Sequence, residues 1–228
     1  MKQSTRHSAK MVLKAVTLVI LSVAFSLQAS ATAQYPDKVW YNGKEYAMHT
    51  NPLEVFFEKN PGRKPKDGVQ STALWRGYVA TFEIKDNQLL LKDIEIQIVD
   101  TAREHSYKWM SVLNEVFPDQ RVINIDWFTG LLVLPCGKRI NYVHMGYGST
   151  YENYILLEIG QGKLTREKKL GHKEYEKFKA QQFQAFKETD EYKKLKESLK
   201  KDGSTNAFID SFLKDFITEY STKILVDN

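Results

Sequence analysis

The sequence is poor in the residues that cross-link chains or bind metals. Cys136 is the only cysteine in 228 residues, so no disulfide can form within one chain. The four histidines beyond residue 33 show no metal-ligand spacing. The chain also lacks the Gly-x-Ser-x-Gly elbow, the His-Glu-x-x-His helix and the third glycine of a dinucleotide loop. We therefore expect a fold held together by packing, with no metal or other cofactor, and we favour a non-catalytic protein.

Long apolar runs are also missing. A membrane-spanning helix needs about 20 apolar residues, whereas residues 15–27 give an uncharged run of only thirteen. This run follows a basic, acid-free start and precedes two overlapping small-x-small sites, 29–31 and 31–33. The pattern predicts a signal peptide over residues 1–33, cleaved near Ala31 or Ala33. The mature protein should be periplasmic or extracellular, with no transmembrane anchor left after cleavage.

The excess of positive charge belongs to this leader. The whole chain has a formal net charge of +5, from 33 basic and 28 acidic residues. Four of the basic residues and none of the acidic ones precede residue 34, so the mature chain is close to neutral. Basicity therefore gives no reason to expect nucleic acid as a partner. The expected partners are a peptide, a glycan or an envelope protein.

The first half of the mature chain predicts two β-hairpins and a short helix. Asn-Gly at 42–43 suits a type I′ turn between strands. Asn51, Pro52 and Glu54 have the spacing of a capping box at the start of a helix that should run to about Lys59. A longer hairpin is expected over 74–84 and 89–99. Either a β-bulge near Lys92 and Asp93 keeps the apolar residues of its second strand on one face, or both faces are covered there. Residues 109–117 suggest a short helix or irregular cover.

The second half predicts more strands and then helices. Strands are expected over 122–134 and 139–159, with Pro135 and Gly137 in a turn between them. Residues 173–201 have helical periodicity with a break at Thr189, and a last helix carries an apolar stripe of phenylalanines. This broad stripe should pack on the sheet or on the preceding helix; it comprises Phe208, Phe212, Phe216 and Tyr220 beside Ile209, Leu213 and Ile217.

The predicted fold class is α+β, an antiparallel β-sheet of several hairpins followed by C-terminal helices. Residues 34–162 would form the sheet-rich domain, and residues 163–228 a helical segment packed on it.

Polar and aromatic residues crowd around two glycines in residues 141–152, which suggests a binding loop. A site there requires Tyr147 and Ser149 to be exposed and Gly146 or Gly148 to have a positive φ. Ordinary cross-strand packing is the alternative. Two further clusters join an aromatic ring to a polar side chain, although Arg76 could instead pair with Glu83 or Asp126 as a strut. The candidate ligand-binding residues are Trp75, Arg76, Asp126, Trp127, Tyr142, His144, Tyr147, Ser149, Tyr151 and Glu152.

Several of these segments resemble an uncharacterised family of exported bacterial proteins. The resemblance is carried by Trp-Arg-Gly-Tyr at 75–78 and by Tyr-Val-His-Met-Gly-Tyr-Gly-Ser at 142–149, together with residues 42–46 and 50–54. It covers roughly residues 38–160. It implies a bacterial envelope or secreted setting, and it implies no activity.

Three hypotheses about function follow. The leading one is an exported, non-catalytic binding protein with an aromatic, glycine-rich surface. The second is a small secreted hydrolase that uses Asp126, His144 and Glu152, or Cys136 with His144. The third is an envelope scaffold that associates through the C-terminal helices, which would leave their apolar stripe exposed.

Overall fold

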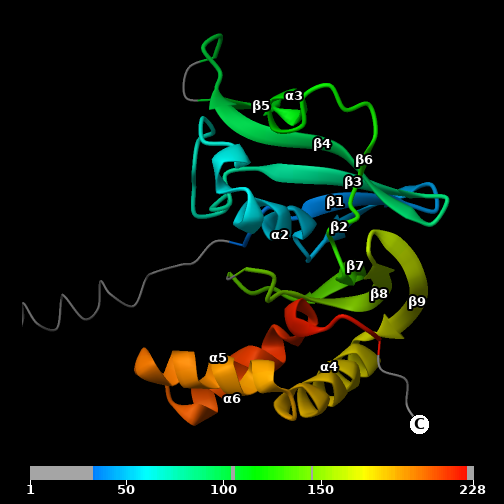
Figure 1. Ribbon diagram of the computed structural model, residues 1–228, viewed down its shortest axis with the longest axis vertical. Coiled ribbons are helices and arrows are strands. Elements are labelled where there is room, and N and C mark those ends of the chain that lie inside the picture. Colours follow the sequence, from blue (N-terminus) through cyan, green and yellow to red (C-terminus); the bar gives the residue numbers. More distant parts are fainter. Residues whose placement is uncertain (1–32, 104–105, 145, 225–228) are drawn as a thin grey trace, which may run out of the picture.

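The computed structural model describes residues 33–103, 106–144 and 146–224 (Figure 1). The predicted signal peptide therefore lies almost entirely outside the described residues. Over the described ranges, no helix is long and apolar enough to cross a membrane. The fold is α+β, as predicted: a large, mostly antiparallel sheet followed by helices.

The first part of the sheet has the strand order β2-β1-β3-β4, with β5 on the far side of β4. β1 and β2 form the predicted hairpin, and Asn42 and Gly43 have φ values of 50° and 75°, as a type I′ turn requires. β1 lies parallel to β3, while the other pairs are antiparallel. The elements are β1 (Asp37–Tyr41), β2 (Lys44–Met48), α2 (Pro52–Lys59), η1 (Pro61–Arg63), β3 (Val79–Lys85), β4 (Gln88–Val99) and β5 (Tyr107–Ser111).

The second part of the sheet is the antiparallel meander β7-β8-β9. It joins the first part at both of its ends. Gln88 of β4 pairs with Lys163 of β9, and the amide of His49, just after β2, donates to the carbonyl of Val133 in β7 (2.8 Å). The sheet is therefore curved, with one of its faces turned inward. The elements are α3 (Leu113–Val116), β6 (Ile123–Asn124), β7 (Gly130–Asn141), β8 (Thr150–Gly160) and β9 (Lys163–Gly171).

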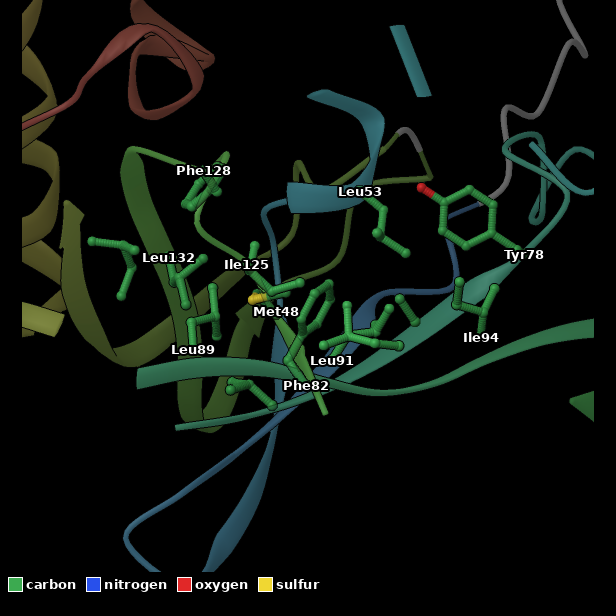
Figure 2. Close-up of a cluster of buried hydrophobic side chains, with 14 of the residues drawn as sticks. Met48, Leu53, Tyr78, Phe82, Leu89, Leu91, Ile94, Ile125, Phe128 and Leu132 are labelled. Carbon is green, nitrogen blue, oxygen red and sulfur yellow. The ribbon is translucent and has the colours of Figure 1, made fainter. Parts of the chain in front are cut away.

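The main hydrophobic core fills this curved sheet (Figure 2). Leu89 and Leu91 of β4 point inward, and so does Ile94, although strict alternation would turn it outward. The ladder with β3 shifts register here, because Thr81 pairs with Asp93 and Phe82 with Leu91. Lys92 is thus the extra residue of the predicted bulge. Both apolar sets consequently share one buried face.

The side of β7 and β8 that points away from the main core is covered by helices, which lie at one end of the molecule in Figure 1. Tyr175 of α4 stacks on Tyr154 of β8, with ring centroids 3.9 Å apart. The predicted break at Thr189 is confirmed, since its hydroxyl accepts a hydrogen bond from the amide of Tyr192 and caps the next helix. The helices are α4 (His172–Lys187), α5 (Asp190–Lys201), α6 (Asn206–Asp215) and η2 (Ile217–Tyr220).

Three predictions about secondary structure were wrong. Residues 107–111 form strand β5, and only the four residues of α3 are helical after it. β7 runs through Pro135 and Gly137 without a turn, because Gly137 adopts φ 78° in a bulge of the ladder with β8. Residues 163–171, predicted as part of the helical segment, form strand β9; the helix predicted from residue 173 begins at His172.

The predicted apolar stripe of the last helix is buried only in part. Ile209, Leu213 and Ile217 are fully buried against α4 and α5. Phe208 and Phe212 are exposed instead. The Phe208 ring stacks on that of Phe212 with centroids 6.1 Å apart, and the Phe212 ring lies tilted against that of Phe216 at 4.8 Å.

Candidate functional site

Arg76 lies at the centre of a buried polar cluster. Its side chain is 2% exposed and that of Asp37 is 0% exposed. Arg76 Nη2 donates to Asp37 Oδ1 at 3.0 Å and to the carbonyl of Tyr35 at 3.0 Å. The same Asp37 oxygen accepts from the amide of Ala80 at 2.9 Å. The strut interpretation of Arg76 thus holds, but its partner is neither Glu83 nor Asp126.

The other guanidinium nitrogen joins two more segments to this cluster. Arg76 Nη1 donates to Tyr147 Oη at 2.5 Å and also to Asn51 Oδ1, and the Tyr147 hydroxyl donates to the same Asn51 oxygen at 3.0 Å. Asn51 therefore makes no side-chain cap for α2. Glu54 binds Lys64 and Tyr78 instead. The helix begins where predicted, but the expected capping box is absent.

Burial sets the protonation of the cluster. It raises the pKa of Asp37 to about 6, against the opposing effect of Arg76, and it raises the pKa of Tyr147 to about 12. Burial also lowers the pKa of His49 to about 4; its ring stacks on Tyr147 with centroids 4.6 Å apart. At neutral pH the cluster therefore contains a charged Asp37–Arg76 pair, a protonated tyrosine and a neutral histidine. It joins four separate segments of the chain.

The 141–152 segment is held by this cluster and by its own contacts. Tyr147 is half-buried and not exposed as a binding loop would require. Gly146 does have the expected positive φ, 51°. Ser149 Oγ accepts from the amide of Val143 at 3.1 Å and donates to its carbonyl at 3.3 Å. Most of the polar groups in this loop are therefore used to shape it.

The remaining candidates in this segment lie on the surface or serve as struts. Tyr142 and His144 are exposed and meet edge to face, with centroids 4.5 Å apart. Tyr151 is half-buried, and its ring meets that of His49 edge to face. Glu152 Oε2 accepts from the amide of Lys138 at 2.8 Å, which supports the bulge in β7.

The structure separates the residues of the proposed hydrolase. Asp126 precedes the start of β7 and His144 follows its end. A twelve-residue strand spans roughly 35–40 Å, at about 3.3 Å per residue. Trp127, next to Asp126, packs against Phe56 of α2 with centroids 5.0 Å apart. Asp126 and His144 therefore lie beyond opposite ends of β7.

Cys136 borders an open hollow of about 330 Å³ on the surface of β8 and β9. Burial raises the pKa of its thiol, so the reactive thiolate is disfavoured. The residues around the hollow are Asn153, Tyr154, Ile155, Lys169, Leu170 and Gly171, and His144 is not one of them. The thiolate pair of Cys136 with His144 therefore has no geometric support here.

A different surface carries exposed aromatic rings, and sequence reasoning missed most of it. We call it the outer face: Tyr35, Val99, Tyr107 and Trp109. These four side chains are 45%, 59%, 59% and 39% exposed. Val99 pairs with Tyr107 across β4 and β5, Trp109 is two residues along the same strand, and its ring meets Tyr35 edge to face at 5.7 Å. The alternation of aromatics in Tyr-Lys-Trp was the available signal.

Trp75 adds to the exposed aromatic residues near the outer face. It is 60% exposed, while the next residue, Arg76, points into the buried cluster. Its segment is joined to that of Tyr35, since the amide of Tyr35 donates to the carbonyl of Ala73 at 2.9 Å. Of the predicted site residues, Trp75 is the one whose position suits binding at this surface.

No family model, curated protein or solved structure matches the chain. Within the described ranges, no group of three or more histidine, cysteine, aspartate or glutamate side chains could hold a metal ion. The chemistry of the described surface must therefore identify what the protein does.

Proposed function

We propose that the protein is an exported, non-catalytic interaction protein of the bacterial envelope or the extracellular medium, and that it binds its partner through the outer face. The observation that carries the binding proposal is the contiguous exposure of Tyr35, Val99, Tyr107 and Trp109. Large apolar side chains cost free energy when they face water, and contiguous exposed patches typically mark interaction sites. Tyr and Trp are also the side chains most enriched at binding hot spots.

Export rests on the sequence of residues 1–33. N-terminal sequencing of the mature protein from the periplasm or the medium should begin within a few residues of Gln34. Recovery of intact Met1 from a membrane fraction would show that the leader is an anchor.

Binding is tested with paired tryptophan variants. Trp40 is exposed on β1, at a distance from β5 in the sheet, and so serves as the control for Trp109. An envelope or medium protein that binds the immobilised mature chain should be retained by Trp40→Ala and lost from Trp109→Ala. Equal retention by both variants would place the binding surface elsewhere.

The exposed phenylalanines of α6 support a second candidate function, association through the C-terminal helices. Phe208 and Phe212 form an apolar strip on a helix whose opposite face is already buried. Sedimentation velocity over a range of concentrations should then show self-association that Phe208→Ser abolishes. A protein that stays monomeric at all concentrations would refute self-association through α6.

A further inference from the structure

β5 is a free edge of the sheet. It pairs with β4 on one side, and all five of its residues are exposed. On its other side, the described parts of the chain supply neither a strand nor a backbone hydrogen bond. Figure 1 shows β5 at the end of the molecule away from α4, α5 and α6, next to the short helix α3 that follows it.

The phase of the ladder shows which backbone groups are unpaired. The amide of Val112 donates to the carbonyl of Ile94, and the amide of Asp100 donates to the carbonyl of Ser106, at the two ends of the β4–β5 pair. Alternate residues of an antiparallel strand bond to the same neighbour. The even-numbered residues of β5 therefore bond to β4. The N–H and C=O groups that point outward belong to Tyr107, Trp109 and Ser111.

A comparison with β9 suggests that the open edge of β5 is functional. Exposed edges invite pairing with other chains, and proteins usually protect them with charges, prolines or bulges. β9, which meets β4 at one residue pair only, carries charges at five of its nine positions: Lys163, Arg166, Glu167, Lys168 and Lys169. β5 has one charged residue, Lys108, no proline and an uninterrupted register.

We propose that β5 binds an extended peptide segment of the partner, which adds to the sheet as one more strand. This inference rests on the proposed function, because it specifies how the outer face is used. The side chains of Tyr107 and Trp109 lie on the outer face, so the peptide residues opposite them would lie beside those rings. The expected ligand is therefore an extended peptide with apolar side chains at alternate positions.

A second copy of this chain fits the edge less well. A stable dimer usually buries about 800 Å² on each partner, from roughly 20–30 residues a side. β5 offers five residues, with Tyr35 and Val99 beside them. An added peptide strand needs only the unpaired backbone groups and the neighbouring rings, and these are what the edge presents.

The probe is the heptapeptide Ac-TVTFTVT-NH2, titrated against the mature protein by tryptophan fluorescence. Placed opposite Trp109, its Phe and both Val residues would lie on the outer face and direct their N–H groups at β5, while its Thr N–H groups would point away. We expect a dissociation constant below about 1 mM. N-methylation at Val, Phe and Val should weaken binding at least about tenfold, and N-methylation at Thr less than about threefold.

Two substitutions at Tyr107 test the same hydrogen bonds from the protein side. Tyr107→Ala removes the ring, whereas Tyr107→Pro removes the ring and the outward N–H. The N–H of this first strand residue does not bond to β4, so proline is compatible with the fold. We expect Tyr107→Pro to bind the heptapeptide about three- to tenfold more weakly than Tyr107→Ala.

The outcomes separate this inference from the proposed function. If both N-methylated peptides bind as tightly as the parent peptide, and Trp109→Ala weakens all three, the outer face binds ligands but strand addition is wrong. No binding at 1 mM would also overturn strand addition, while the comparison of Trp109→Ala with Trp40→Ala would still test the function. A wild-type dimer that Tyr107→Pro dissociates would identify a second copy as the occupant and refute the peptide.

Discussion

Replacing Arg76 should be among the most damaging changes in the protein, and its cost should depend on pH. In Arg76→Met the guanidinium is lost and Asp37 stays buried, with only the amide of Ala80 bonded to its carboxylate. Removing one partner of a buried ion pair typically costs about 3–5 kcal/mol. A domain is stabilised by about 5–15 kcal/mol in total. The variant should therefore lose a large part of its stability at pH 7.5.

Acid should restore part of that loss. Arg76 lowers the pKa of Asp37, so without it the pKa must rise above its present value of about 6. The folded state then favours the protonated acid, while the unfolded chain keeps a pKa near 3.8. Such a group destabilises the fold as pH rises through the folded-state pKa. At pH 5 the buried acid of the variant is neutral, so the gap to the wild type should be smaller.

Urea unfolding followed by tryptophan fluorescence at pH 7.5 and pH 5 measures both effects. Adding Asp37→Asn to Arg76→Met should recover stability at pH 7.5 and remove the extra pH dependence. Lys64→Met serves as a control, because its ion pair with Glu54 is partly exposed and should contribute about 1 kcal/mol or less. A loss below about 1 kcal/mol for Arg76→Met, or an equal gap at both pH values, would refute the reasoning.

Three further predictions concern the core and the turns. His49 is neutral in the fold, with a pKa of about 4, but protonates near 6.5 when unfolded. The free energy of unfolding of the wild type should therefore fall by about 3 kcal/mol as the pH falls from 6.5 to 4. His49→Phe cannot take up this proton, so it should unfold less readily than the wild type in acid in the same urea assay. Leu213→Ala should lower the free energy of unfolding by about 2–5 kcal/mol, whereas Phe212→Ser on the exposed side of the same helix should lower it by less than about 1 kcal/mol. Equal losses in melting experiments would contradict the assignment of the buried and exposed faces of α6. Gly162→Ala should lower the melting temperature more than Gly43→Ala, because both glycines have φ near 76° but only at Gly162 would a Cβ lie 2.7 Å from the carbonyl oxygen of Ile125.

Local rules predicted the elements that local chemistry determines. Positive φ at Asn42 and Gly43 requires residues that tolerate it, and Thr189 caps a helix within its own turn. The bulge at Lys92 followed from the need to keep Leu91 and Ile94 on one face. Each of these outcomes depends on residues within a few positions of one another.

The failures have a common cause in long-range packing. β5 and β9 have exposed residues on both faces, so neither shows the sustained alternation of a half-buried strand, and in β5 the aromatic alternation covers only Tyr107 and Trp109. On α6 the phenylalanine stripe and the neighbouring Ile209 stripe have the same four-residue period, and only the position of α4 decides which one is buried.

The partner of Arg76 could not be found from the sequence either. Several carboxylates were available, and the one chosen lies 39 residues away. It is selected because β1 runs parallel to β3, with Lys38 paired to Thr81. The outer face could not be predicted from the sequence for the same reason, since Tyr35 reaches Trp109 only after β1, β3, β4 and β5 are assembled.

The position of β1 also constrains the order of folding during export. Strands 1 and 3 are joined by contacts across about forty residues, Arg76 reaches Tyr147 across 71, and the hydroxyl of Tyr41 donates to Glu167 across 126. Non-local contacts of this kind close late and slow the folding of a domain. Under the export proposed above, a chain that leaves the cytoplasm N-terminus first cannot complete the surroundings of its first strand until most of its length has crossed the membrane. The topology would thus delay folding and help keep the chain competent for translocation.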